Sequence, residues 1–186
     1  TSAGLVWVAA VSAALWLLAV GAGRRALGRA DAAVPMREFP APPVRHAVLI
    51  MNPRSGGGKV ERFGLREKAE ALGAEVRLLE GPGETDVAEL ARRAAAEGAD
   101  LLGVAGGDGT QALVADVAAS LGLPFLVIPA GTRNHFALDL GLDREDPSTA
   151  LAALSDGVEL RVDLGRAGER TFVNNVSFGA YAEVVQ

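Results

Sequence analysis

Three glycine-containing segments of this 186-residue chain carry residue types that can hold a phosphate group. They are residues 52–59 (Asn-Pro-Arg-Ser-Gly-Gly-Gly-Lys), 106–110 (Gly-Gly-Asp-Gly-Thr) and 129–134 (Pro-Ala-Gly-Thr-Arg-Asn). Glycine lets the backbone turn with positive φ and approach a ligand closely. Where such a loop opens a helix, the first N–H groups are unpaired and carry a partial positive charge, which favours an anion. The loops therefore predict a phosphate site built from Asn52, Arg54, Ser55, Gly56, Gly57, Gly106, Gly107, Asp108, Gly109, Thr110, Gly131, Thr132 and Asn134.

Hydroxyl groups and cations in the same loops fit this role. Hydroxyls can donate to phosphate oxygens, and cations can offset their charge. The groups in question belong to Ser55, Thr110 and Thr132, and to Arg54, Lys59 and Arg133. The first loop taken alone also fits an ordinary tight turn. It is not a Walker A loop, because Val60 follows Lys59 where a Ser or Thr would bind Mg²⁺, and the chain has no Gly-x-Gly-x-x-Gly fingerprint.

Asp108 is the acidic residue among these glycines, at a position where Ala or Asn would be enough for a turn. Its carboxylate is predicted to meet a metal–nucleotide complex or the proton of a hydroxyl group. The alternative is that Asp108 caps a helix.

After residue 46, apolar runs alternate with helical stretches, which predicts an α/β fold with a parallel sheet flanked by helices. Strands are expected over 47–51, 74–79, 101–105 and 125–128. Helices are expected over 60–72, after a cap at Thr85 or Asp86, over 110–121 and over 147–154. The three glycine loops would then lie at the carboxyl ends of parallel strands, where open α/β sheets bind their ligands.

The last part of the chain changes pattern. Residues 160–165 and 170–178 flank Ala-Gly-Glu and predict a β-hairpin. A lone hairpin is marginal in water, so we expect residues 158–186 to begin a second, antiparallel β domain that is truncated at Gln186. Because the chain starts with Thr and ends within a strand-like run, it is expected to be a fragment at both ends.

The first 23 residues carry no charged side chain, and residues 4–22 are almost wholly apolar. About 20 such residues cross a bilayer core of roughly 30 Å, so a transmembrane helix is predicted. A buried helix or a secretory signal peptide are the alternatives, although no basic segment precedes the apolar run as in a signal peptide. Arg24, Arg25 and Arg29 follow at once, which predicts that this end and the domain after it are cytoplasmic, with the protein anchored in the membrane.

Composition and charge divide the chain into segments and exclude several kinds of site. The segments predicted are a membrane helix with its basic flank (1–29), a Pro/Ala linker (30–45), an α/β nucleotide-binding domain (46–157) and the β-rich segment (158–186). The absence of Cys excludes disulfides and Cys-ligated metal centres, and two His residues are too few for a His-rich metal site. A net charge of −5 does not suit nucleic-acid binding. No oligomeric state follows from the sequence.

The three motifs, in this order and each after a strand, resemble the catalytic domain of the diacylglycerol kinase family, which includes bacterial lipid kinases and the sphingosine and ceramide kinases. The resemblance covers residues 46–186. It implies ATP and Mg²⁺ as cofactors and transfer of the γ-phosphoryl group to the hydroxyl of a membrane lipid such as diacylglycerol. It also implies that Asp108 is catalytic, and that Asp108 and Asp163 help to hold the metal.

Two departures from the family pattern matter for these roles. Leu113 and His135 stand where bacterial members commonly have acidic residues, so that either Asp139 substitutes or the metal is held differently. The usual general base of the bacterial enzymes would lie beyond Gln186. Two alternatives stay open: a NAD kinase-like phosphotransferase, which shares a Gly-Gly-Asp-Gly loop, and an inactive membrane-tethered nucleotide-binding regulator.

Overall fold

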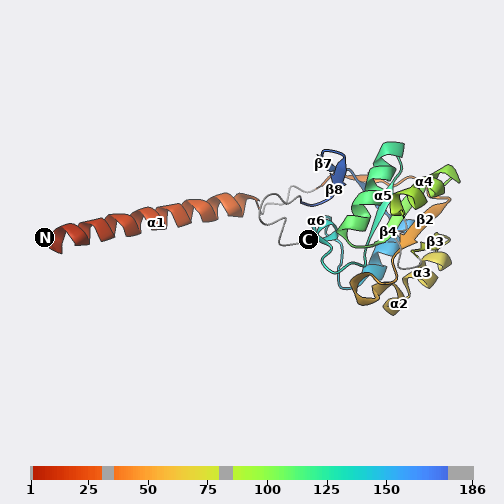
Figure 1. Cartoon of the computed structure of the whole chain (residues 1–186), viewed down its shortest axis with the longest axis horizontal. Helices are drawn as coiled ribbons and strands as arrows, with labels where there is room; N and C mark the ends of the chain where they lie inside the picture. Colours follow the sequence, from red (N-terminus) through yellow and green to blue (C-terminus); the bar gives the residue numbers. More distant parts are fainter. Residues whose placement is uncertain (1, 31–35, 80–85, 176–186) are drawn as a thin grey trace. The chain divides into compact units, whose positions relative to one another are not determined.

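A computed structural model of the chain describes residues 2–30, 36–79 and 86–175 (Figure 1). The chain divides into two compact units, Thr1–Arg37 and Glu38–Gln186. In the first unit, one helix, α1 (Ser2–Ala30), includes a 20-residue apolar stretch from Val6 to Arg25 with a mean hydropathy of 2.0. At 1.5 Å per residue this stretch is long enough for a bilayer core, so α1 is a candidate membrane span by length and composition.

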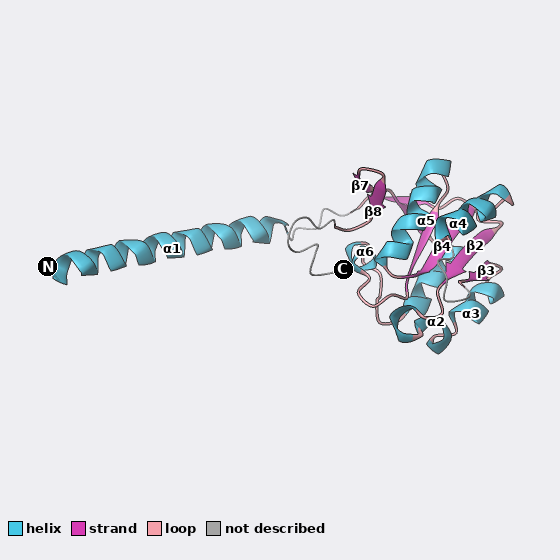
Figure 2. Cartoon of the chain, viewed as in Figure 1, coloured by secondary structure: helices cyan, strands magenta, loops and turns pink. Residues whose placement is uncertain are grey.

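The second unit is built on a four-stranded parallel sheet, as the alternation of apolar runs and helices predicts. Its strands are β2 (Ala47–Met51), β3 (Glu75–Leu78), β4 (Leu101–Gly106) and β5 (Phe125–Pro129), in the order β3-β2-β4-β5. Strands β2 and β4 are buried throughout, because helices cover both faces of the sheet (Figure 2).

Alternate residues of β2 and of β4 belong to two separate hydrophobic cores. On one face, Leu49 and Met51 pack with residues of α2 (Lys59–Arg62) and α3 (Leu65–Ala71), and with the 3₁₀-helix η2 (Pro147–Ala152). On the other face, Val48 and Ile50 pack with α4 (Val87–Ala96) and α5 (Asp108–Leu121). Figure 1 shows these two helical layers on opposite sides of the sheet. The period of two along β2 thus fixes which helices lie over which face.

Two helical predictions differ from the structure. The stretch 60–72, expected as one helix, forms α2 and α3 with a break at Gly64, whose φ of 59° is left-handed. The stretch 147–154 forms η2 and then the short helix α7 (Ala153–Asp156). The predicted cap at Asp86 is present, since its carboxylate accepts the Glu89 N–H at 3.0 Å, whereas Thr85 lies outside the described residues.

Two small antiparallel pairs complete the second unit. Strand β1 (Glu38–Pro40), inside the stretch predicted as linker, pairs with β6 (Val158–Leu160). Strands β7 (Gly165–Ala167) and β8 (Arg170–Phe172) form a hairpin around the predicted Ala-Gly-Glu turn. The first arm therefore begins at Gly165 and not at Leu160, because Leu160 belongs to the pair with β1. Residues 176–178 of the predicted second arm lie outside the described residues.

An ion-pair network lies at the amino end of the sheet. His46 Nε2 is 2.9 Å from Glu75 Oε2, and Arg77 contacts the same carboxylate at 2.7 Å. The hydrogen bond with Glu75 is the main cause that raises the pKa of His46, and the same bond lowers the pKa of Glu75. The two groups attract each other most at a pH where both are charged.

We predict that the contribution of His46 to stability depends on pH. The raised pKa means that its stabilisation is complete below the unfolded value of about 6.5 and is lost as pH rises through the folded value. Because Glu75 must be ionised, the window opens above about pH 4.3. Both side chains are more than a third exposed, so the effect is at most about 1 kcal/mol. Thermal unfolding of wild type and His46→Gln should differ more at pH 5.5 than at pH 8.5.

The other histidine supplies the control. His135 is not part of the His46–Glu75 ion pair, so His135→Gln measures the loss of an imidazole without the loss of this pair. An equal or larger effect of His46→Gln at pH 8.5 would contradict the prediction.

Candidate functional site

The three glycine loops meet at one edge of the sheet because they follow three neighbouring parallel strands. Met51 of β2 is paired with Ala105 of β4, and Gly106 of β4 is paired with Pro129 of β5. The strands therefore end level with one another, and the Asn52 N–H donates to Ala105 O at 3.0 Å. The prediction that the loops converge is confirmed by this geometry.

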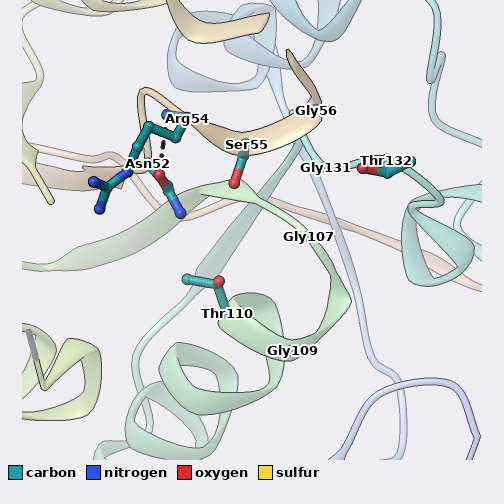
Figure 3. A pocket seen from close by; sticks show the side chains of 9 residues that line it. All are labelled: Asn52, Arg54, Ser55, Gly56, Gly107, Gly109, Thr110, Gly131 and Thr132. Carbon is teal, nitrogen blue, oxygen red and sulfur yellow. Dashed lines mark hydrogen bonds between the residues drawn. The ribbon is translucent and has the colours of Figure 1, made fainter. Parts of the chain in front are cut away.

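A cleft of about 390 Å³ opens between the loops (Figure 3). Its volume is in the range of small-molecule sites. Every described residue that lines it belongs to the set predicted from the sequence. The lining residues are Asn52, Arg54, Ser55, Gly56, Gly107, Gly109, Thr110, Gly131 and Thr132.

Glycine is required at two points where the loops touch. Gly56 has a φ of 55°, and a Cβ there would overlap the Ala130 carbonyl oxygen and lie 2.9 Å from Gly131 O. A Cβ at Gly131 would overlap Gly107 Cα and lie 2.7 Å from Asn134 Oδ1. The loops are thus in contact backbone to backbone, which brings their N–H groups to one cleft.

Unpaired backbone donors gather around this cleft. Helix α5 begins at Asp108, and its first internal bond runs from Gln111 N–H to Gly107 O at 3.0 Å. Among the described residues, none accepts from the N–H groups of Asp108, Gly109 and Thr110, or from that of Gly56. With a 14-residue helix behind them, the α5 amides form an anion site of the kind found at helix N-termini.

Three hydroxyls and a guanidinium add to the lining. Figure 3 shows Ser55 and Thr110 facing the space between the first two loops, with Thr132 on the third loop. Arg54 lines the same cleft, and its N–H donates to Asn52 Oδ1 at 3.1 Å, which holds the first loop in shape. The described residues of the lining include no carboxylate, so the lining favours a negatively charged ligand.

Asn134, predicted as part of the phosphate site, instead holds the third loop from inside. It is buried with a left-handed φ of 53°, and it does not line the cleft. Its Oδ1 accepts from Gly131 N at 2.9 Å, and its Nδ2 donates to the carbonyls of Pro129 and Gly131 at 3.1 and 2.8 Å. These three bonds fix the Gly131 backbone against Gly107.

Asp108 lies at the cleft without lining it, and its carboxylate joins the second and third loops. Oδ2 accepts the His135 N–H at 3.0 Å, and Oδ1 accepts the Phe136 N–H at 3.1 Å, at the start of α6 (His135–Asp139). Asn174 Nδ2 also lies 3.5 Å from Oδ2. This geometry matches the capping alternative for Asp108.

Other predicted residues take other places. Lys59 Nζ donates to Arg144 O at 2.7 Å, and Arg133 O accepts from Arg144 Nη1 at 3.0 Å. Neither Lys59 nor Arg133 lines the cleft, so their role in offsetting phosphate charge is not supported. Gly106 is the buried last residue of β4, and Gly57 lies beside the cleft in the first loop.

The described residues contain no group of three or more His, Asp or Glu that could hold a metal ion. Asp108 already accepts from two amides, and Asp163 is exposed with no hydrogen bond or ion pair among the described residues. A site that holds Mg²⁺ through protein groups is not formed by these residues. The metal role of Asp108 and Asp163 stays a prediction.

Gln111 is a structural residue of the site that the sequence argument missed. It is 2% exposed, and its Nε2 donates to the carbonyls of Val104, Gly106 and Ile128 at 3.2–3.4 Å. It therefore ties the ends of β4 and β5 beneath the loops. The signal was present, because Gln111 shares the helical spacing of the buried residues Val114 and Ala118.

Comparisons with known proteins give one consistent result. The family described as diacylglycerol kinase catalytic domain matches residues 46–167. A diacylglycerol kinase of Bacillus subtilis is 34% identical over 145 residues, which cover 76% of this chain and 48% of that protein. A diacylglycerol kinase of Mycobacterium tuberculosis is 34% identical over 119 residues, covering 63% of this chain and 38% of that protein. The chain thus spans less than half the length of these relatives.

A solved structure agrees with the sequence comparisons. The crystal structure of a diacylglycerol kinase from Bacillus anthracis aligns with a TM-score of 0.55 and 25% identity, covering 71% of this chain and 47% of that one. The parallel sheet with its helical layers is therefore shared with these proteins.

We predict that Gly131→Ala separates the loops and destabilises the chain. The added methyl must displace Gly107 or break the Asn134 bond, at a cost of about 1–3 kcal/mol. Gly109→Ala is the matched control, because nothing lies within 4 Å of its added Cβ and the residue is helical. Thermal unfolding should show a lower midpoint for Gly131→Ala alone. Equal midpoints for the two variants would refute the close contact.

Proposed function

Because the chain belongs to the diacylglycerol kinase catalytic domain family, we propose that it binds ATP in the loop cleft and takes part in transferring the γ-phosphoryl group to a lipid hydroxyl such as that of diacylglycerol. The observation that carries the proposal is the convergence of unpaired N–H groups from the first two loops on one cleft, with a third loop held against them. Such donors suit the β- and γ-phosphates of a nucleotide.

In this proposal the residues of the chain position the nucleotide and neutralise the charge of its phosphates, since phosphoryl transfer needs little else from the protein. The α5 amides hold phosphate oxygens, Ser55, Thr110 and Thr132 donate from their hydroxyls, and Arg54 supplies positive charge. In the reaction, the acceptor oxygen bonds to the γ-phosphorus, the bond to the β-phosphate oxygen breaks, and the hydroxyl proton passes to a base. Mg²⁺, when bound with the nucleotide, would neutralise charge on its phosphates.

Membrane anchoring through α1 belongs to the same proposal. The apolar stretch Val6–Arg25 has the length of a span, and Arg24 and Arg25 at its end favour a cytoplasmic location for the domain that follows. A kinase whose acceptor is dissolved in the bilayer gains effective concentration when it is tethered there. Flotation with phospholipid vesicles tests this part, and recovery of the full-length protein in the soluble fraction would oppose it.

The proposed reaction can be tested directly on the full-length protein that contains this chain. Purified protein with γ-labelled ATP should transfer label to diacylglycerol in mixed micelles, while NAD offered in the same preparation should stay unlabelled. Binding of ATP without transfer to any lipid would favour the regulator alternative. Label on NAD alone would favour the NAD kinase alternative.

We predict that Asp108→Asn lowers kcat much more than it lowers ATP affinity. An amide in place of the carboxylate keeps one acceptor, so that only one of the His135 and Phe136 N–H groups stays bonded and α6 moves relative to the cleft. A misplacement of about 1 Å can cost about 100-fold in rate. Steady-state lipid phosphorylation and titration with a fluorescent nucleotide measure the two effects separately.

Asp156→Asn is the control for this prediction. It removes an exposed carboxylate that has no recorded partner among the described residues. Its activity should equal that of the wild type. Full turnover by Asp108→Asn would remove the Asp108 carboxylate from the mechanism.

A further inference from the structure

The hairpin after the α/β layer is attached to the middle of α5 through one carboxylate. Thr171 Oγ1, in β8, donates to Asp116 Oδ1 at 2.6 Å, and Arg166 Nη2, in β7, donates to the same oxygen at 2.9 Å. Arg166 Nε also lies 3.4 Å from Thr171 Oγ1. One acid on α5 thus fixes both strands of the hairpin.

The chain that continues from β8 contacts α5 a second time, at Asp108, the first residue of the helix. Three residues after Thr171, the Asn174 amide reaches Asp108 Oδ2 at 3.5 Å. Asp108 and Asp116 are eight residues apart on the helix, about 12 Å at 1.5 Å per residue, and three extended residues span about 10 Å. Residues 171–174 therefore run along α5 toward its N-terminus, and a carboxylate of α5 holds each end of this segment.

Between the two attachments, Val173 packs against the apolar cluster that includes Val127 and Phe136. Phe136 belongs to α6, whose N–H groups bond to Asp108. The segment 171–174 is thus in contact with both helices whose first residues flank the cleft.

The contact at Asp116 is better suited to setting the register of β8 on α5 than to raising the free energy of unfolding. The hydrogen bond from Thr171, and then that from Arg166, lowers the pKa of Asp116, so the acid is ionised at neutral pH. Its side chain is 39% exposed and that of Arg166 is 66% exposed, and such pairs contribute little to unfolding free energy. A hydroxyl and a guanidinium that converge on one oxygen nevertheless define one alignment of strand and helix.

We propose that Asp116 is a positioning residue for phosphoryl transfer: it sets the register of residues 171–174 on α5, so that Asn174 reaches Asp108 and holds the second and third loops in their relative orientation. The inference rests on the proposed function. Asp116 acts through Asn174 and Asp108, and it has no hydrogen bond to the described residues of the cleft lining.

Steady-state kinetics of the full-length protein test the proposal. In Asp116→Ala and Thr171→Val, kcat for lipid phosphorylation should fall between about 10-fold and 100-fold, while the KM for ATP should stay within about twofold. Thr171→Ser keeps the hydroxyl and should restore the rate. Arg170 lies one residue away in β8, is exposed, and has no hydrogen bond or ion pair among the described residues, so Arg170→Ala is the matched control and should equal the wild type.

A double-mutant cycle asks whether Asp116 and Asn174 act in series. If they do, Asp116→Ala combined with Asn174→Ala should lose no more activity than the worse single variant. Multiplied losses would show independent roles and overturn the proposal. So would an unchanged kcat in Asp116→Ala, or equal losses in kcat and ATP affinity with a lowered unfolding midpoint, which would indicate a merely structural role.

Hydrogen exchange gives a readout that does not need turnover. The N–H groups of His135 and Phe136 donate to Asp108, so their exchange should be faster in Asp116→Ala than in Arg170→Ala. Unchanged exchange would oppose the proposed coupling. A wild-type protein that shows this coupling but phosphorylates no lipid would overturn the proposed function and leave the positional role of Asp116 standing.

Discussion

Contact between the backbones of three loops is the constraint on which the site depends. Gly56 touches the carbonyls of Ala130 and Gly131, and Gly131 touches Gly107, at distances that leave no room for a side chain. Sheet order makes the contact possible, because β2, β4 and β5 are neighbours that end level. Asn134 then keeps the third loop in place from within. The polar lining of the cleft has a defined geometry because the loops beneath it cannot move apart without breaking these contacts.

The parts of the structure that could be predicted from the sequence are those governed by local patterns. Buried parallel strands appear as wholly apolar runs, and the loop after each one is marked by glycine, so both the sheet and the cleft lining follow from residue types. The family resemblance, carried by the same three motifs, is confirmed by the match over residues 46–167.

The parts that could not be predicted depend on partners distant in sequence. Whether Asp108 faces a ligand or caps α6 is decided by residues 135 and 136, which local spacing does not place beside it. Lys59 donates to the carbonyl of Arg144, and Leu160 pairs with Glu38 of β1. Gly64 interrupts a helix whose apolar spacing is continuous, because its left-handed φ turns the chain between α2 and α3. In each case a long-range contact or a single dihedral angle outweighs the local pattern.

The pairing of β1 with β6 places the entry and the exit of the α/β layer side by side. Glu38 lies opposite Leu160, and the Arg161 guanidinium stacks over the Phe39 ring at 4.6 Å. A layer that the chain enters and leaves at one point can be joined to other modules on both sides without disturbing its sheet, as domains with adjacent ends generally can. The segments before residue 38 and after residue 161 can therefore change while the contacts among the three loops stay the same.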